Sequence, residues 1–310
     1  MAPGSLFAIL TLLFFFIECS PHSSDPNGPF LSLIALEDLE TGTFFDDFSY
    51  ADTTSASSQN SWTFRNDSGG PGPSGASWSE SNLSFGLEGS DTYLRLIAIT
   101  QGSAASTTQS EIATGPRKFF RGTYAARIKF FDSATTGTTY DRVNQTFFLI
   151  TPLAYGGDPL YSECDFEYLG QGGWGESTST LFLTTWGTYN PSANFYDDVS
   201  TPDVESLDGW HTLVLQVSDS NTKYYVDGNL KVKHLGHVVP DSSMRISFNL
   251  WFLSDLGDLD TSQTSLREYE ERVDWVYYEK NRIIPPDQVQ IKVDSLRSQS
   301  LSYTDSVPSH

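Results

Sequence analysis

The chain has 310 residues, of which 39 are acidic and 18 are basic, so its formal net charge is −21. A chain this acidic repels nucleic acid and anionic membrane surfaces, which excludes those partners in favour of a neutral or cationic one. Phe, Tyr and Trp make up 14% of the residues. Such rings suit stacking on sugars as well as filling a core, and the length favours one large all-β domain.

The first segment in chain order is an apolar run at residues 6–17, LFAILTLLFFFI. It has the length of the apolar part of a signal peptide and is too short for a typical membrane-spanning helix. We therefore predict a secreted, extracellular protein with a signal peptide at residues 1–19 and a linker at 20–42. Loss of Cys19 with the leader leaves Cys164 as the only cysteine, so no disulfide framework is available. Glycosylation sequons begin at Asn66, Asn82 and Asn144.

Short runs rich in β-branched and aromatic residues follow, and no long stretch has a helical period. Residues 51–82 are rich in Ser, Gly and Pro and predict long loops, whereas Asp227-Gly228 predicts a two-residue hairpin turn. This pattern predicts a two-sheet antiparallel β-sandwich, or jelly roll, at residues 43–284, with a C-terminal extension at 285–310 that holds a short helix. The predicted strands are residues 92–99, 122–131, 145–150, 177–186, 210–217, 222–226, 229–235, 244–253 and 272–280.

Three carboxylates alternate within the run YSECDFEYLG, at Glu163, Asp165 and Glu167. In a strand these positions point to one face, while Cys164 and Phe166 point to the other. Like charges on neighbouring positions of one face repel, and Asp and Glu are depleted from strands. Something must therefore compensate for the cost of placing them there.

The spacing allows the chemistry of a retaining glycosidase. Four residues of strand span about 13 Å, and two glutamate side chains that lean inward reach the ~5 Å separation which that mechanism uses. One carboxylate would act as nucleophile and the other as acid and then base, while Asp165 hydrogen-bonds to the nucleophile and keeps the two pKa values apart. Spacing alone leaves two alternatives open, an exposed acidic strand face and a metal site made by the same oxygens.

The run and its flanks resemble glycoside hydrolase family 16, which includes lichenases, laminarinases and xyloglucan endotransglycosylases. Its signature, Glu-x-Asp-x-Glu, matches ECDFE and is often followed by an aromatic residue, Leu and Gly, as in EYLG. The family's other segments, in order, are similar to FFDDFSY at 44–50, SEIATGPRKFFRGTYAARIKFFDS at 110–133, GWHTLVLQVSDSNTKYYVDGNLKVKH at 209–234, ISFNLWFLSD at 246–255 and ERVDWVYYEK at 271–280.

The resemblance implies a concanavalin A-like jelly roll with a substrate cleft across its concave sheet. It also implies Glu163 as the nucleophile, Asp165 as the assisting carboxylate and Glu167 as the acid/base. Many laminarinases carry two residues and a bulge before the acid/base, whereas this chain has one residue there. The unbulged form resembles lichenases and transglycosylases, so the resemblance favours a β-glucan with 1,3 and 1,4 linkages.

The binding residues are less sharply indicated than the three carboxyls. Sugar-stacking candidates are Trp186, Trp251, Trp174 and Tyr168, and each is equally typical of a core or loop aromatic. Asp274 matches a calcium-ligand position of lichenase-like members, but one carboxylate does not define a calcium site with its six to eight oxygens. A structural aspartate satisfied by its neighbours is the alternative. The resemblance implies a reaction that requires no cofactor, and it allows one structural calcium.

The sequence thus predicts a secreted, monomeric, retaining endo-β-glucanase that acts on a polysaccharide. A transglycosylase that remodels cell-wall glucan or xyloglucan and a noncatalytic carbohydrate-binding jelly roll remain alternatives, and galactan or chitin substrates remain open. Activity should be bell-shaped against pH on the acidic side of neutral. It should fall when Glu163 is protonated and when Glu167 loses its proton.

Overall fold

The computed structural model describes residues 40–254 and 257–309. The predicted signal peptide and most of the predicted linker lie outside these residues. Within the described part of the chain, no helix is both long and apolar enough to cross a membrane.

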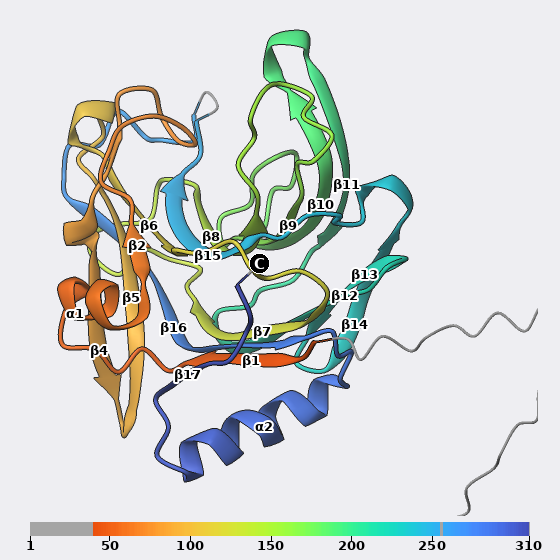
Figure 1. Cartoon of the computed structure of the whole chain (residues 1–310). Helices are drawn as coiled ribbons and strands as arrows, with labels where there is room; N and C mark the ends of the chain where they lie inside the picture. The colour runs from red at the N-terminus through yellow and green to blue at the C-terminus, as the bar shows by residue number, and fades with distance from the viewer. Residues whose placement is uncertain (1–39, 255–256, 310) are drawn as a thin grey trace, which may run out of the picture. The chain divides into compact units, whose positions relative to one another are not determined.

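Two curved sheets of mainly antiparallel strands face each other (Figure 1), which confirms the predicted β-sandwich. Sheet I contains β14 (Asn229–Leu235), β13 (Asn221–Val226), β12 (Gly209–Val217), β7 (Gly122–Phe130), β16 (Arg267–Lys280), β5 (Asp91–Thr100) and β4 (Leu83–Glu88), with β1 (Gly42–Asp46) and β17 (Tyr303–Asp305) added beside β16. Sheet II contains β11 (Phe195–Asp203), β10 (Thr180–Asn190), β9 (Glu163–Leu169), β8 (Val143–Ile150), β15 (Arg245–Phe252), β6 (Thr108–Thr114) and β2 (Trp62–Phe64).

The remaining elements are short, apart from the C-terminal helix. They are α1 (Thr53–Asn60), α2 (Pro286–Ser298), the two-residue strand β3 (Ser77–Trp78) and 3₁₀ turns at Glu80–Asn82, Ala104–Ser106, Pro191–Ala193 and Gly236–Val238. Helix α1 corrects the prediction that residues 51–82 are all loop. Its sequence, TTSASSQN, has no apolar stripe, and Asp52 starts the helix by accepting a hydrogen bond from the Ser55 N–H.

The core lies between the two sheets, and strand alternation decides which side chains enter it. On β9, Cys164, Phe166 and Tyr168 are buried. The Phe166 ring stacks on Phe147 of the neighbouring strand with centroids 5.8 Å apart. One face of β9 is thereby fixed against the core, and its other residues point away from it.

All nine predicted strand runs coincide with strands, and the predicted hairpin joins β13 to β14. Asp227 and Gly228 both have positive φ, 49° and 79°, as a two-residue hairpin turn requires. The prediction missed β11, whose sequence FYDDVSTPD lacks a regular apolar alternation and includes a proline. Strand β11 is an edge strand that pairs with β10, and edge strands tolerate a proline and an irregular apolar pattern.

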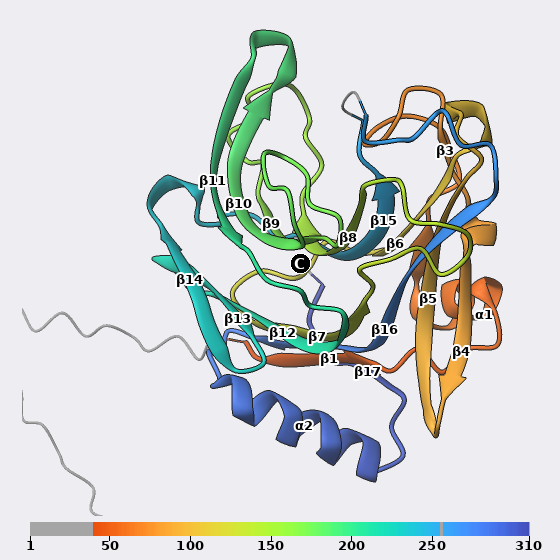
Figure 2. The ribbon, with the colours of Figure 1, turned by 180° about the vertical axis from the view of Figure 1, so that it is seen from behind.

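The C-terminal extension is part of the sandwich. Helix α2 lies against sheet I (Figure 2), and its Val289 and Val293 pack in one cluster with Phe45, Trp275 and Tyr277. Strand β17 then pairs with β1. The buried residues of α2 explain why a helix with few apolar residues stays folded, because packing rather than propensity stabilises it.

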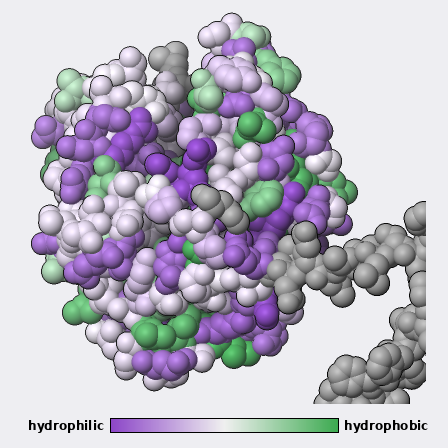
Figure 3. All heavy atoms as spheres, viewed as in Figure 1, coloured by the Kyte–Doolittle hydropathy of each residue, from purple (hydrophilic) through white to green (hydrophobic). Residues whose placement is uncertain are grey.

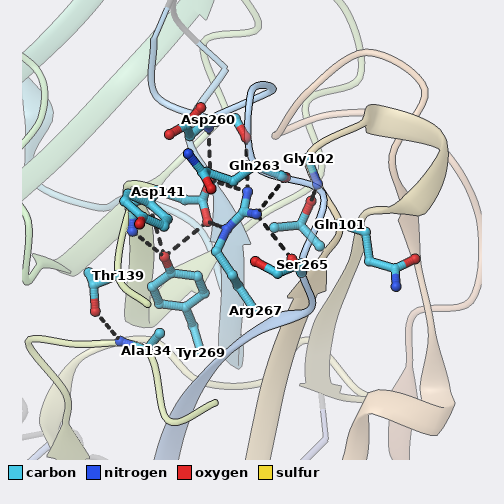
Figure 4. Close-up of polar contacts among 12 residues, drawn as sticks. Gln101, Gly102, Ala134, Thr139, Asp141, Asp260, Gln263, Ser265, Arg267 and Tyr269 are labelled. Carbon is cyan, nitrogen blue, oxygen red and sulfur yellow. Dashed lines mark hydrogen bonds and ion pairs between the residues drawn. The ribbon is translucent and has the colours of Figure 1, made fainter. Parts of the chain in front are cut away.

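A buried ion pair joins Arg267, the first residue of β16, to Asp141 in the segment before β8 (Figure 4). Arg267 and Asp141 are both fully buried, and the Arg267 Nε lies 2.6 Å from Asp141 Oδ2. Arg267 also donates to the backbone carbonyls of Asp260 and Gln263, and Tyr269 donates to the same carboxylate. A guanidinium with this many acceptors fixes the connecting segment against the sheets.

Candidate active site

The face of β9 that points away from the core carries Glu163, Asp165 and Glu167. Strand pairing places them between two neighbours, with Trp186 of β10 opposite Glu163 and Thr146 of β8 opposite Glu167. The structure therefore brings the three carboxyl groups together on one surface, as the alternation predicts. Figure 3 shows the outline of the molecule notched above these strands, with the β10–β11 hairpin on the right of the notch.

Glu163 is held at its carboxylate by a tyrosine. The Tyr161 hydroxyl donates to Glu163 Oε2, and this tyrosine is itself only 2% exposed. Burial raises the pKa of Glu163 to about 7, although the hydrogen bonds from Tyr161 and Asp165 oppose that rise. Both bonds favour the ionised form of Glu163.

Glu167 has a different environment, because its hydrogen-bond donor is an amide. Asn144 Nδ2 donates to Glu167 Oε1 over 2.9 Å. Burial, assisted by the negative charge of Glu163, raises the pKa of Glu167 to about 8. Hydrogen bonds from Tyr161 and Asp165 favour the ionised form of Glu163, whereas the charge of Glu163 disfavours ionisation of Glu167, as the roles of a nucleophile and a general acid require.

Asp165 is the most enclosed of the three, at 4% exposure. Burial raises its pKa well above the usual range, and the charges of Glu163 and Glu167 raise it further. The protonated form of Asp165 is thereby favoured, and its closeness to Glu163 favours this form further, because a protonated carboxyl can donate to a carboxylate. Because the carboxyls of the row share protons, they do not all carry a negative charge at once. This reduces the repulsion between neighbouring carboxylates that the sequence predicts.

A second polar row, missed by the sequence analysis, runs across the same face. Thr146 donates to Asn249, and Asn249 Nδ2 donates to Glu111 Oε2 over 3.3 Å, which also pairs with Arg65 at 3.4 Å. From the core side, Glu271 accepts a hydrogen bond from the Thr146 N–H over 3.0 Å. The available signal was the polar residues at alternate positions of otherwise apolar strands, as in VNQTFFLI and RISFNLWF.

Asn144 shows how a sequence motif misleads when its burial is unknown. It begins a glycosylation sequon, yet its side chain is fully buried and bonded to Glu167. Asn82 is 6% exposed and donates to Thr108 and to the Gln109 carbonyl. Of the three sequons, only Asn66 offers an exposed asparagine.

Three of the four aromatic candidates lie near the carboxyl groups. Trp186 is partly exposed opposite Glu163, and Trp251 is partly exposed on β15 opposite Asn144. Trp174 is 42% exposed, and its ring lies 6.2 Å from that of Trp251. These three residues therefore offer ring surface on the side of the sheet that carries the carboxyls.

Tyr168 is a correction, because it belongs to the core. Its side chain is fully buried and lies against Phe130, with ring centroids 4.8 Å apart. Its hydroxyl donates to Asp132 and accepts from the Leu207 N–H. An even-numbered position on β9 points away from Glu167, so this ring cannot touch a sugar bound there.

The surroundings of Asp274 do not fit a calcium ion. Asp274 is 2% exposed, and its two oxygens accept from Arg127 and Arg297, each over 2.6 Å. Two guanidinium groups already neutralise the carboxylate, whereas calcium needs six to eight oxygen ligands. The described residues also include no group of three or more His, Cys, Asp or Glu side chains arranged to hold a metal. Asp274 is therefore a structural aspartate held by two arginines, and its surroundings do not suit a calcium ligand.

The arrangement suits glycosidic bond cleavage by two carboxyls. One carboxylate is favoured in its ionised form, a second carboxyl is favoured in its protonated form, and both emerge from one rigid strand.

No protein-family model matches the chain. A β-glucanase of Paenibacillus macerans is 26% identical over 136 residues, which cover 44% of this chain and 53% of that protein. The match thus spans about half of the relative's length.

Solved structures identify the fold more completely. A β-glucanase of Bacillus licheniformis matches with a TM-score of 0.56 and 21% identity, over 76% of this chain and 97% of that one. A family 16 glycoside hydrolase from the mixed-linkage glucan PUL of Bacteroides ovatus, solved with a G4G4G3G product, matches with a TM-score of 0.58 and 18% identity, over 75% and 98%. The fold is thus the jelly roll of the β-glucanases. These structures confirm the fold that the resemblance to glycoside hydrolase family 16 implies.

Proposed function

We propose that the chain is a retaining endo-β-glucanase that cleaves a β-1,3/β-1,4-linked glucan by double displacement. The observation that carries the proposal is the row of three carboxyls on β9, in which Tyr161 donates to Glu163 and Asn144 donates to Glu167. These partners distinguish the two glutamates, so that each suits one role in the reaction.

In the first step, an ionised Glu163 oxygen forms a bond to the anomeric carbon while the glycosidic bond breaks. Glu167 gives its proton to the leaving oxygen, which departs as a hydroxyl group. The Tyr161 hydroxyl holds Glu163 in place by a hydrogen bond before attack, and a protonated Asp165 beside it would donate a second one. The product of this step is a covalent glycosyl-enzyme.

In the second step, Glu167 is a carboxylate and acts as the base. It takes a proton from water, whose oxygen attacks the anomeric carbon and displaces Glu163 as a carboxylate. Two inversions at one carbon restore its configuration, and both glutamates return to their starting protonation states. One water molecule is consumed for each bond cleaved, and the two steps then balance in protons and electrons.

Three observations support the substrate class. The relatives are named for β-glucan and mixed-linkage glucan, and the spacer in ECDFE is the unbulged form. A formal charge of −21 disfavours anionic polysaccharides. The apolar run at residues 6–17 supports an extracellular location, where a polymer of this kind is accessible.

The test is release of reducing ends from barley mixed-linkage β-glucan, laminarin and xyloglucan, by wild type beside Glu163→Gln. We expect release by wild type, highest on the mixed-linkage polymer, and none above background by the variant, which keeps the shape of the side chain. Equal release by the two proteins would contradict the role of Glu163. No release from any of these polymers, together with measurable binding to one, would instead identify a carbohydrate-binding protein.

Product sizes separate hydrolysis from transfer, since both start from the same glycosyl-enzyme. Chromatography of the products should show only fragments smaller than the substrate. Products longer than an oligosaccharide substrate would show that a sugar hydroxyl replaces water in the second step, which is transglycosylation.

A further inference from the structure

Aromatic side chains form a continuous set of ring contacts that leads away from Glu163. Tyr161, which donates to Glu163, meets Tyr189 edge to face at 5.2 Å between centroids. Tyr189 meets Trp186 at 5.8 Å, and Trp186 lies 6.4 Å from Tyr196. The rings become more exposed along this path, from 2% at Tyr161 to 53% at Tyr196.

The β10–β11 hairpin supplies Trp186, Tyr189 and Tyr196, and it projects beyond the other strands of its sheet (Figures 1 and 2). Tyr189 pairs with Tyr196 near its tip, and Trp186 pairs with both Glu163 and Asp198. Three residues of strand separate Trp186 from Tyr189, a span of about 10 Å. A register shift between Trp186 and Thr188 lets Tyr189 share the face of Trp186, so the rings extend the surface beside Glu163 towards the tip of the hairpin.

We propose that Trp186, Tyr189 and Tyr196 form a distal sugar-binding surface, here called the hairpin subsite, that holds the substrate chain beyond the bond being cleaved. Its occupant is a further stretch of the same neutral β-glucan, continuous with the sugar at Glu163. The inference rests on the proposed function and deepens it. It makes the enzyme a polymer-selective one whose affinity grows with the length of the glucan.

The chemistry of the surface matches a sugar chain. A pyranose ring has faces of C–H groups and an edge of hydroxyls, and tyrosine and tryptophan likewise combine an apolar ring with a polar edge. Two-torsion aromatic side chains also lose little conformational entropy when they bind. Asp198, paired with Trp186 on the same face, is an acceptor for sugar hydroxyls beside the ring. A neutral chain suits this acidic protein better than an anionic one.

The same strand provides a matched control. Phe195 is 48% exposed, close to the 53% of its neighbour Tyr196, but successive residues of a strand point to opposite faces. Asp197, which shares the face of Phe195, pairs with His237 on the far side of the hairpin. Phe195→Ser therefore removes a similar exposed ring from β11 without touching the hairpin subsite.

The experiment measures the binding of glucan oligosaccharides of increasing length by calorimetry, in the full chain carrying Glu163→Gln so that no substrate is consumed. In this background, affinity should rise with length. Adding Tyr196→Ser should lower affinity for the longest oligosaccharide about tenfold and leave that for the shortest unchanged, whereas Phe195→Ser should change neither.

A kinetic measurement in the active protein completes the test. Tyr196→Ser should lower kcat/KM on polymer by a similar factor and spare a short chromogenic oligosaccharide. If wild type cleaves glucan and Tyr196→Ser behaves as Phe195→Ser on every length, the hairpin subsite is refuted while the proposed function stands. If wild type neither cleaves nor binds any glucan, the proposed function itself fails.

Discussion

One face of β9 is buried between two sheets, where Cys164 and Phe166 are each 1% exposed. The other face holds Glu163, Asp165 and Glu167, whose pKa values are all raised by burial. The first face stabilises the fold by packing, whereas the second places like charges beside one another at a cost in stability. A strand can combine the two because its side chains alternate.

The comparison shows how the carboxyls are positioned. Each of them sits one residue from a core side chain that cannot move without disturbing both sheets. The core face therefore fixes the backbone, and donors such as Tyr161 and Asn144 fix the carboxyl groups. Sites on rigid strands hold their geometry better than sites on loops.

The largest expected effect comes from removing either glutamate. Glu163→Ala and Glu167→Ala should each lower kcat on glucan about 10⁴-fold, because one lacks the nucleophile and the other the acid. Added azide should then distinguish the roles. Glu163→Ala should give an α-glycosyl azide by a single displacement, and Glu167→Ala a β-glycosyl azide by two. The opposite assignment of products, read by NMR, would reverse the two roles.

On the core face, Phe166→Ala should reduce the free energy of unfolding by about 3–5 kcal/mol, since it leaves a cavity where Phe166 stacks on Phe147. Urea unfolding monitored by tryptophan fluorescence measures this. Phe195→Ala, which truncates an exposed ring, serves as the control and should change the free energy by no more than about 0.5 kcal/mol. Equal effects of the two substitutions would mean that the faces are not distinct.

On the carboxyl face of β9, by contrast, a substitution should raise the free energy of unfolding. Because the pKa of Asp165 is raised in the folded state, folding retains a proton that the unfolded chain releases above the ordinary aspartate pKa. The free energy of unfolding then falls by up to about 1.4 kcal/mol per pH unit between the unfolded and folded pKa values. Asp165→Asn should remove this decline. The variant would be inactive yet more stable than wild type at pH 7, an advantage that should shrink towards pH 4.

Activity against pH should be bell-shaped, and the structure shifts its expected position. Below the Glu163 pKa of about 7 the nucleophile is protonated, and above the Glu167 pKa of about 8 the acid has lost its proton. The maximum of kcat/KM therefore moves from the acidic side of neutral, expected from the sequence, towards neutrality. A rate that is flat from pH 4 to 9 would contradict both assignments.

The smallest expected effect is that of metal removal. Arg127 and Arg297 occupy both oxygens of Asp274, so EDTA or added calcium should leave the Tm of wild type unchanged. Arg297→Met should lower the Tm, because it leaves part of a buried carboxylate unpaired. A fall in Tm with EDTA, reversed by calcium, would show that a calcium site exists elsewhere in the chain.

The strands and the carboxyl row could be predicted because both depend on local alternation. The same alternation places Tyr168 on the face of β9 opposite the carboxyls. The prediction of Tyr168 as a sugar contact was therefore inconsistent with the strand geometry. The donors to the carboxyls behave differently. Asn144 comes from a neighbouring strand, and the polar row beyond it joins Asn249 to Glu111, 138 residues apart. Such contacts depend on sheet order, which a single sequence does not specify.

The surroundings of Asp274 were out of reach for the same reason. One of its partners, Arg297, lies on the C-terminal helix, and the other, Arg127, lies on β7, 147 residues earlier in the chain than Asp274. The motif match indicated that Asp274 binds calcium. In the folded chain, two guanidinium groups neutralise this carboxylate in place of a metal ion. Charge compensation of this kind is visible only once distant segments are packed together.

The most direct test of the central claim is the configuration of the first reducing ends released from mixed-linkage glucan, followed by proton NMR within the first minutes of reaction. Double displacement at Glu163 predicts that the β-anomer forms first and that the α-anomer appears later by mutarotation. Initial release of the α-anomer would mean a single displacement by water, and Glu163 could not be the nucleophile.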